Sequence, residues 1–346
     1  MHPVVQLDPA DEAVWDAYVT RHPSGSIYHL SRWRRLIADW YGHEAHYLYA
    51  RDADTENVVG ALPLIRLKSL LFGDYLVSMP YFNYGGAIAD SAYVEESLMT
   101  HAATMADQLG CSHIEFRDAA TQRAGWAVRT DKIGMQLALP ATVDALWTNL
   151  GSKLRAQVKR PQREAGVEIQ RGGRELLSDF YDVFSRNMRD LGTPVYPIAM
   201  FDDILKAFPQ AASIVVVRFA GRAAAAGFLI GFRDRLEIPW AASRRELNRV
   251  GFNMLLYWEI LKFAVEQRYA IFDFGRSSRE GGTHQFKKQW GARETPIYWH
   301  YWLAAGKKIP NLTPKNTKYG LAINVWKKMP VAIANRIGPW LVGNLP

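Results

Sequence analysis

Apolar positions in the second half of the chain fall into three consecutive strand-like segments separated by short polar turns. The segments cover residues 214–219, 223–232 and 236–242, and the turns between them read AGR and RDR. Runs of this length, bounded by turn residues, predict strands that form a meander. Residues 251–267 then carry apolar side chains at helical spacing, and residues 270–275 read AIFDFG. The pattern predicts a meander, a largely apolar helix and a further strand.

The first half of the chain repeats this order of elements. Strand-like segments lie at residues 46–50, 58–67 and 75–79, and they are followed by a helical stretch at 92–110 and a strand at 112–118. The two copies agree in element order but not in sequence spacing, because Gly60 to Gly227 is an offset of 167 residues and Phe116 to Phe274 an offset of 158.

This repetition predicts a mixed α/β (α+β) fold built from two tandem units of the same kind. The first unit is expected at residues 1–148 and the second at residues 149–305, with a basic amphipathic tail at residues 306–346. A chain of 346 residues that is 49% hydrophobic is long enough to bury two ordinary cores.

Composition narrows the environment and the partners. The single cysteine, Cys111, excludes an intramolecular disulfide and a cysteine-rich metal site, so we expect a reducing compartment and no metal. The N-terminus MHPVVQLDPADE does not read as an export signal, and the longest apolar run, residues 223–232, is half of the roughly 20 residues that a membrane-spanning helix needs. We therefore expect a cytoplasmic protein. Its formal charge of +8 favours an anionic partner, such as a phosphate-bearing small molecule, tRNA or an acidic membrane surface; ordinary solubility charge is the alternative.

Three stretches of the sequence carry a resemblance to a known family. They read GSKLRAQVKRPQREAGVEI (151–169), NMRDLGTPVYP (187–197) and FDFGRSSREGGTHQFKKQWGA (272–292). Together with the repeated unit they resemble the FemAB-like aminoacyltransferases, which have a tandem GNAT fold, and in particular the branch associated with exopolysaccharide and exosortase/PEP-CTERM loci. The likeness covers most of residues 26–303.

The resemblance implies an acyltransferase that forms an amide on an amine-bearing cell-envelope or exopolysaccharide precursor by direct aminolysis of an activated ester. It implies no tightly bound cofactor, and an aminoacyl-tRNA, a carrier-bound acyl group or an acyl-CoA as the donor. The expected acceptor is an anionic small molecule or a lipid-linked glycan. The resemblance also implies that Lys287 stabilises the oxyanion or a phosphate, and that the backbone carbonyl of Phe286 orients the amine. The alternative for Lys287 is a solvated basic turn.

Other residues of the 272–292 stretch are candidates on chemical grounds. Asp273 alternates with two phenylalanines, so its side chain should leave the face that they pack and act as an acid, a base or the partner of an arginine. His284 is a candidate proton acceptor. Arg276 suits a phosphate or carboxylate clamp, with an ion pair to Asp273 as the alternative. Trp290 suits stacking on a sugar or base, with a place in the core as the alternative.

Two further segments suggest substrate binding in the second half. Arg155, Lys159 and Arg163 lie at positions i, i+4 and i+8, so they would form a basic stripe on one helical face that suits contact with phosphates, although Pro161 should break or kink that helix and shorten the stripe. A solvated face is the alternative. In the segment at 187–197 the polar candidates for acceptor recognition are Asn187, Arg189 and Tyr196.

In the first half, aromatic segments at 26–33 and 79–86 resemble those of the family. They suggest a cleft floor between the two halves, formed by Tyr28, Tyr81, Asn83 and Tyr84. An aromatic cluster at a domain interface is the alternative.

The place where acetyl-CoA-dependent GNAT enzymes usually have a glycine-rich turn reads ELNRVGFN, with Gly251 alone. This argues against ordinary acetyl-CoA chemistry. Two other functions stay open: an acyl-CoA-dependent N-acyltransferase of GNAT type, and a non-catalytic tandem-GNAT protein that binds a glycan or lipid. The tail at 316–346 combines tryptophans and cations, which suits peripheral contact with a membrane surface. Packing of its apolar residues on the protein body is the alternative.

Overall fold

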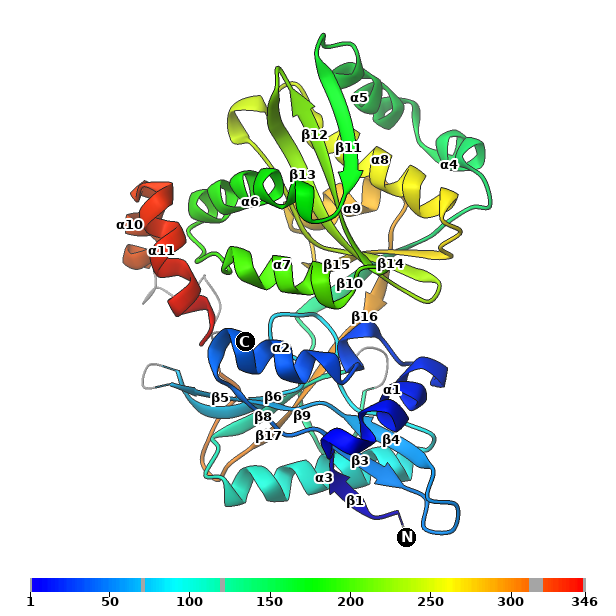
Figure 1. The fold of residues 1–346 in the computed structure, drawn as a ribbon, viewed down its shortest axis with the longest axis vertical. Coiled ribbons are helices and arrows are strands. Elements are labelled where there is room, and N and C mark those ends of the chain that lie inside the picture. Colours follow the sequence, from blue (N-terminus) through cyan, green and yellow to red (C-terminus); the bar gives the residue numbers. More distant parts are fainter. Residues whose placement is uncertain (1, 70–71, 119–121, 311–319, 345–346) are drawn as a thin grey trace. The chain divides into compact units, whose positions relative to one another are not determined.

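The computed structural model describes residues 2–69, 72–118, 122–310 and 320–344. The chain divides into two compact units (Figure 1). The first comprises Met1–Lys132, Pro296–Leu312 and Gly343–Pro346, and the second comprises Ile133–Thr295 and Thr313–Val342. The units therefore do not follow the linear segments 1–148, 149–305 and 306–346, because the second unit already begins at Ile133 and the chain returns to the first unit at Pro296.

The first unit contains two sheets. One has the order β1 (Val4–Gln6), β3 (Leu48–Arg51), β4 (Val58–Leu62) and β7 (Ile88–Ala89). The other has the order β2 (Glu44–Ala45), β5 (Ile65–Ser69), β6 (Gly73–Val77), β8 (His113–Asp118), β17 (Tyr298–Leu303) and β9 (Ala127–Arg129). The expected single strand over 58–67 was wrong, because the chain leaves one sheet and enters the other around Pro63, which has no N–H for a ladder.

Helices cover these sheets. They are α1 (Glu12–Arg21), α2 (Arg32–Tyr41) and α3 (Ala92–Gln108). The backbone N–H of Val94 donates to the Ser91 side chain (3.3 Å), which caps the start of α3. Val94 and Leu98 of α3 then pack with Leu48 and Leu62 of the first sheet. The expected helix after the meander is confirmed.

The second unit is built on one seven-stranded sheet. Its order is β11 (Val167–Gly172), β12 (Ala212–Phe219), β13 (Arg222–Phe232), β14 (Arg235–Ser243), β15 (Ile271–Ser278), β10 (Lys132–Ala138) and β16 (Arg293–Pro296). The meander β12–β13–β14 is antiparallel, and β15 adds to it in parallel after the crossover helix α8 (Phe252–Glu266). The predicted meander, helix and strand are all confirmed, and with them the mixed α/β class.

Both faces of this sheet are covered by helices. The helices α4 (Val143–Asn149), α5 (Ser152–Gln162) and α8 share a core with Leu229, Phe272 and Phe274. The helices α6 (Leu177–Leu191) and α7 (Ile198–Ala207) lie on the other face, where Phe228 contacts Phe180 and Phe201. Neighbouring residues of a strand point to opposite faces of the sheet. Leu229 therefore faces the helices α4, α5 and α8, and Phe228 faces α6 and α7.

The parallel strands β14 and β15 pair over only part of their length. Pairing begins at Arg235 with Ile271 and ends at Glu237 with Asp273, although β14 continues to Ser243 and β15 to Ser278. The register of β13 against β14 shifts in this region, next to Pro239, which cannot donate to a ladder. The two strands thus separate beyond a pair of buried acidic residues.

The C-terminal segment forms two helices, α10 (Gly320–Lys328) and α11 (Val331–Val342), which both contact α6 (Figure 1). Arg189 of α6 donates to the carbonyl of Met329 (2.7 Å), and Asn335 donates to Ser185 (3.3 Å). The helices α10 and α11 of the tail therefore pack on the second unit. Residues 316–319 and 345–346 of the tail lie outside the described residues. Across the described part of the chain, no helix is long and apolar enough to cross a membrane.

Candidate active site

Lys287 lies on a helix and not on a loop. The glycine-rich loop expected to carry it is, over its second half, the helix α9 (Gly282–Gln289). Phe286 and Trp290 are four residues apart and both pack against Tyr257, with ring centroids 4.8 and 6.2 Å from it. This packing turns Lys287 inward, and only 8% of the residue is exposed. The alternative of a solvated basic turn is therefore wrong for Lys287, whereas Lys288 is exposed.

The amine of Lys287 is held by two backbone carbonyls of β15. Its Nζ donates to the carbonyl oxygen of Gly275 (3.1 Å) and to that of Arg276 (2.8 Å). Gly275 has a φ of +71°, a left-handed conformation that favours glycine. An ammonium group has three donors, so one N–H of Lys287 is left for a ligand after these two bonds.

Burial and nearby charges set the protonation state of this amine. The pKa of Lys287 is lowered from 10.5 to about 8, chiefly by burial and also by the charge of Arg276, while the carboxylates of Asp273 and Glu237 raise it and offset part of this effect. Both carboxylates are themselves buried. At neutral pH the group is therefore mainly an ammonium ion that gives up its proton more readily than an exposed lysine.

The lowered pKa predicts a pH dependence of stability. Between pH 8 and 10.5 the unfolded chain binds more of this proton than the folded chain, so the contribution of Lys287 to the free energy of unfolding rises with pH. Urea unfolding at about pH 7.5 and about pH 9.5 should show wild type gaining stability relative to Lys287→Met, which has no amine to titrate. A constant difference, or one that moves the other way, would contradict the assigned burial.

Asp273 is fully buried and fixed by three groups. Its Oδ1 accepts from the backbone N–H of Gly275 (2.7 Å), and its Oδ2 accepts from Gln136 (2.8 Å) and pairs with Arg235 (3.5 Å). Its neighbours Phe272 and Phe274 pack in the core with α8, so the predicted alternation is confirmed. The carboxylate serves as a fixed counter-charge for Lys287, and a role as acid or base stays a prediction.

The carbonyl of Phe286 lies in the last turn of α9. The N–H of Trp290 would be its helical partner, but that group donates to the carbonyl of Lys287 instead (3.1 Å). Carbonyls in the last turn of a helix lack their usual partners and can accept from a ligand. This geometry is compatible with the amine-orienting role that the family resemblance implies for Phe286.

The remaining candidates on this stretch differ in accessibility. His284 is buried, its Nε2 lies 3.0 Å from Glu294 Oε1, and its Nδ1 accepts from the N–H of Glu280 (3.3 Å). Both ring nitrogens are thus engaged, and a role in proton transfer would require breaking one contact. Trp290 is 2% exposed and lies in the core. This agrees with the alternative to stacking on a sugar or base. Arg276 is exposed at the end of β15.

The basic stripe of α5 has mostly structural contacts. Arg155 donates to the carbonyls of Leu150 (2.6 Å) and Thr148 (3.3 Å), which closes the end of α4. The amine of Lys159 lies 5.5 Å from the centre of the Trp147 ring. The helix ends at Gln162, one residue after Pro161, so Arg155 and Lys159 are helical as predicted, whereas Arg163 lies just beyond the helix and the stripe is shorter.

The acceptor candidates of the 187–197 segment are placed partly around a cavity. Asn187 and Arg189 line a cavity of about 240 Å³ in the second unit. Arg189 is also tied to Asp190 (2.7 Å). Tyr196 packs against Trp240 and Phe201, and its carbonyl accepts from the hydroxyl of Tyr181 (3.0 Å).

The aromatic candidates of the first unit are largely buried. Tyr28 stacks on Phe82 with ring centroids 4.4 Å apart, and the hydroxyl of Tyr81 donates to the carbonyl of Gly343 (2.9 Å). Tyr84 is buried, and Asn83 is half-buried. The structure therefore gives these tyrosines a packing role, and their contact with substrate stays a prediction.

Sequence reasoning missed three groups around Lys287 and Asp273. Gln136 and Arg235 contact Asp273, and Glu237 acts on Lys287 through its charge. A signal was present for one of them, because Glu237 stands between the apolar residues Leu236 and Ile238 in the strand that the sequence predicts at residues 236–242. A charged residue between apolar neighbours in a strand is expected to be buried, and a buried charge needs a group of opposite charge or a hydrogen-bond donor beside it.

Comparison with known proteins assigns the fold. Residues 151–288, which include Lys287, match the family model described as Acetyltransferase (GNAT) domain. No curated protein sequence matches the chain.

Solved structures resemble the chain over most of its length. FemX has a TM-score of 0.66 at 15% identity, covering 86% of this chain and 96% of its own. L-PGS from Bacillus licheniformis has a TM-score of 0.55 at 15% identity, covering 97% and 98%. A tandem GNAT protein from the clavulanic acid biosynthesis pathway has a TM-score of 0.52 at 12% identity, covering 89% and 100%. The chain therefore has the GNAT acetyltransferase fold, with a GNAT domain at residues 151–288 and structural similarity to FemX and to tandem GNAT proteins.

Proposed function

We propose that the protein is an N-acyltransferase that moves an acyl or aminoacyl group from an activated ester or thioester to an amine. The observation that carries this proposal is the buried amine of Lys287. Two backbone carbonyls fix this amine in place, and its third N–H can donate to a ligand. A preorganised donor of this kind in a site of low dielectric stabilises the negative charge that develops on an acyl oxygen. The GNAT match over residues 151–288 supports the same reaction class.

The reaction follows from these groups. The acceptor amine attacks the acyl carbon, a C–N bond forms, and the carbonyl oxygen takes up the electron pair as an oxyanion. Lys287 donates its third N–H to that oxygen, and the Phe286 carbonyl accepts from the attacking amine. The oxyanion then re-forms the carbonyl and the bond to the leaving oxygen or sulfur breaks. The amine proton is lost to the leaving group or to solvent.

The finer assignment within this class is aminoacyl-type transfer to an amine-bearing cell-envelope or exopolysaccharide precursor in the cytoplasm. The FemAB-like stretches, the net charge of +8 and the cavity lined by Asn187 and Arg189 support an anionic acceptor. Acyl-CoA is the competing donor, and the N-terminus of α8 favours it in one respect. Gly251, with a φ of +96°, begins that helix without a side-chain cap, which leaves its first N–H groups open to an anion.

A product assay distinguishes these donors. Purified protein is incubated with amine-bearing nucleotide-sugars and either acyl-CoA, acylated carrier protein or aminoacyl-tRNA, and new amides are detected by mass spectrometry. Amide formation from any donor supports the proposed reaction, and the productive donor identifies the branch. Donor breakdown at the rate of the protein-free control, with no amide from any pair, would refute it.

The C-terminal helices support a further part of the proposal, peripheral contact with an anionic membrane surface. Ile333, Ile337 and Trp340 are exposed at positions i, i+4 and i+7 of α11, so they share one face, and Trp340 is 67% exposed. Exposed cations flank them at Lys327, Lys328 and Arg336. An apolar helical face with cations at its border binds at a lipid interface, where each cation adds about 1 kcal/mol.

Point substitutions test this contact better than deletion, because the tail packs on α6. The variant Ile333→Gln/Ile337→Gln/Trp340→Gln should lose flotation with anionic liposomes at moderate salt, whereas wild type should float. Val14→Gln removes an equally exposed apolar residue of the first unit and should behave as wild type. Equal flotation of wild type and the triple variant would leave the tail a purely structural element.

A further inference from the structure

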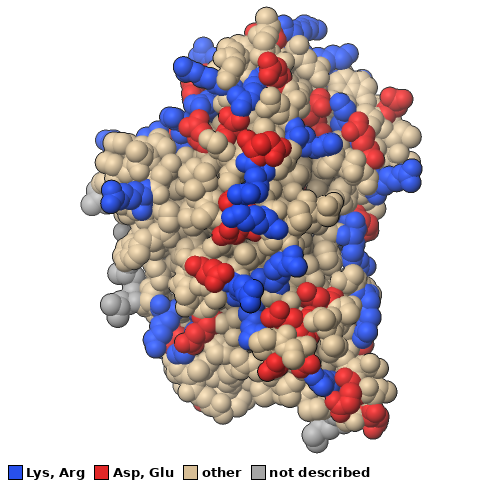
Figure 2. Space-filling model, in the orientation of Figure 1, with Lys and Arg blue, Asp and Glu red and all other residues tan. Residues whose placement is uncertain are grey.

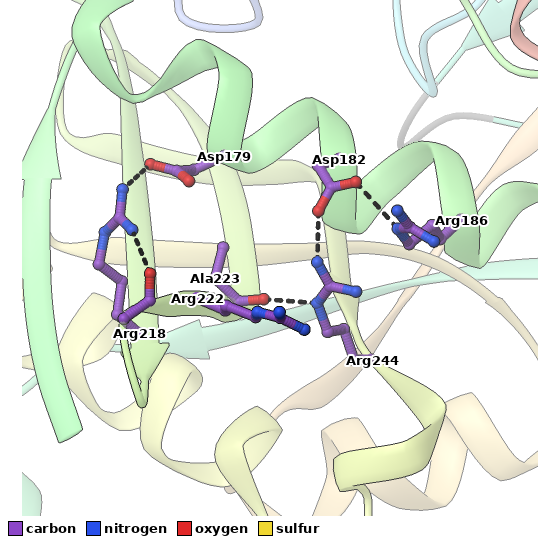
Figure 3. Close-up of a pocket in the computed structure, with 8 residues that line it drawn as sticks. Asp179, Asp182, Arg186, Arg218, Arg222, Ala223 and Arg244 are labelled. Carbon is purple, nitrogen blue, oxygen red and sulfur yellow. Dashed lines mark hydrogen bonds and ion pairs between the residues drawn. The ribbon is translucent and has the colours of Figure 1, made fainter. Parts of the chain in front are cut away.

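A charged pocket of about 440 Å³ lies between α6 and the ends of three strands of the second unit (Figure 3). It is formed where β12 ends, β13 begins and β14 ends, on the face of the sheet that α6 covers. Four arginines and two aspartates contribute to its lining: Arg186, Arg218, Arg222, Arg244, Asp179 and Asp182. The four arginines exceed the two aspartates by two positive charges, and the acyl transfer described above does not use this excess charge.

Two of the arginines are held rigidly. Arg218 pairs with Asp179 and donates to the carbonyl of Gly221 (3.2 Å) and to Gln170 (3.0 Å). Arg244 pairs with Asp182 and donates to the carbonyl of Ala223 (2.7 Å). Side chains fixed in this way lose little conformational entropy when they bind a ligand.

The other two arginines supply the unbalanced charge. Arg186 donates to Asp182 (2.9 Å) while its side chain stays 45% exposed. The Arg222 side chain makes no hydrogen bond or ion pair with any other residue in the described ranges, and in the view of Figure 3 it lies between Arg218 and Arg244. An ion-pair network that served only to fasten α6 to the sheet would not need this fourth guanidinium.

We propose that this pocket binds the phosphate or diphosphate group of a small-molecule ligand. Guanidinium groups match phosphate oxygens with paired N–H donors, and several of them around one concavity suit a multiply charged group. A nucleic acid would instead require a continuous basic surface, whereas Lys and Arg alternate with Asp and Glu on the face drawn in Figure 2. The proposal concerns binding and stands whether or not the chain transfers acyl groups.

Inorganic pyrophosphate is the probe, with binding measured by calorimetry at constant ionic strength. We expect one saturable site, weakened by about tenfold in Arg222→Gln because a charge-assisted contact is lost. The Arg222 side chain has no hydrogen bond or ion pair to lose in the free protein. The thermal unfolding midpoint of Arg222→Gln should therefore equal that of wild type. Arg268→Gln removes an exposed arginine two residues beyond the C-terminal end of α8 and should bind as wild type.

Further arms of the same titration separate the ligand sources. A nucleoside diphosphate or coenzyme A that displaces pyrophosphate, with the same sensitivity to Arg222→Gln, identifies which phosphate-bearing molecule occupies the pocket. Absence of saturable pyrophosphate binding, or equal binding in all three proteins, would overturn the proposal. It would also fail if an RNA oligonucleotide bound more tightly than pyrophosphate and both variants weakened RNA equally, because that would indicate a diffuse surface contact.

Discussion

Replacing Lys287 with alanine is expected to lower the rate of acyl transfer by about 10²- to 10³-fold, the usual effect of removing one oxyanion donor. The amine is buried, two carbonyls fix it, and its remaining N–H is free to meet the reacting oxygen. No other lysine shares this environment on α9, because Lys288 is exposed. The loss should appear in kcat more than in KM, since the contact forms in the transition state.

The control is Lys288→Ala, which removes the same charge one residue away and should retain most of the activity. Truncation of Lys287 also leaves the carbonyls of Gly275 and Arg276 without a donor, at a cost of about 1–3 kcal/mol each, which the release of a buried charge partly offsets. Unfolding midpoints must therefore accompany the kinetics. A folded Lys287→Ala protein with wild-type turnover would end the assignment.

Replacing Arg117 with methionine is expected to destabilise the first unit by about 3–5 kcal/mol, because it breaks a buried ion pair. Arg117 is 1% exposed and pairs with Glu115 at 2.8 Å. Its Nη1 also donates to the carbonyls of Met79 (3.2 Å) and Phe82 (2.5 Å).

Those carbonyls belong to a strained loop. Met79 and Tyr81 both have positive φ, at 56° and 73°, and such residues persist only where their surroundings hold them. Arg117 thus fixes the aromatic loop that the sequence suggested as a substrate contact. Its loss also leaves the Glu115 carboxylate with the hydroxyl of Tyr301 (2.6 Å) but without its cation.

Urea unfolding measures this effect, with Arg35→Met as the control. Arg35 is an exposed arginine of α2 in the same unit, and its substitution should change the midpoint little. A double variant, Arg117→Met with Glu115→Gln, should recover part of the loss, since it no longer buries an unpaired charge. Equal midpoints for Arg117→Met and Arg35→Met would contradict the account of this loop.

The strands of the meander and the helix α8 were predicted correctly, because the spacing of apolar residues within each segment indicates its structure. The runs at 214–219, 223–232 and 236–242 alternate with turns, and each became a strand of the meander. The helix α8 followed from its apolar spacing. Pairing between distant segments carries no local signal, so the contribution of β17 to the first unit and of β10 to the second was not foreseen.

The candidate site was predictable to a similar extent. Lys287 and Phe286 came from the family resemblance, and the direction of Asp273 came from strand alternation. The burial of Lys287 depends on Phe286 and Trp290 packing on Tyr257, about thirty positions earlier, and such tertiary contacts also made a helix of a glycine-rich stretch. The partners Gln136 and Arg235 reach Asp273 from other strands, which no sequence spacing encodes.

A structure with a bound acyl donor, or with a tetrahedral analogue of the reacting carbonyl, would show whether Lys287 contacts the reacting oxygen. We expect the acyl oxygen to lie about 3 Å from Lys287 Nζ, the distance of an oxyanion-hole donor, while the bonds to the Gly275 and Arg276 carbonyls persist. A donor whose reacting carbonyl is bound elsewhere, with Lys287 contacting only those two carbonyls, would contradict it.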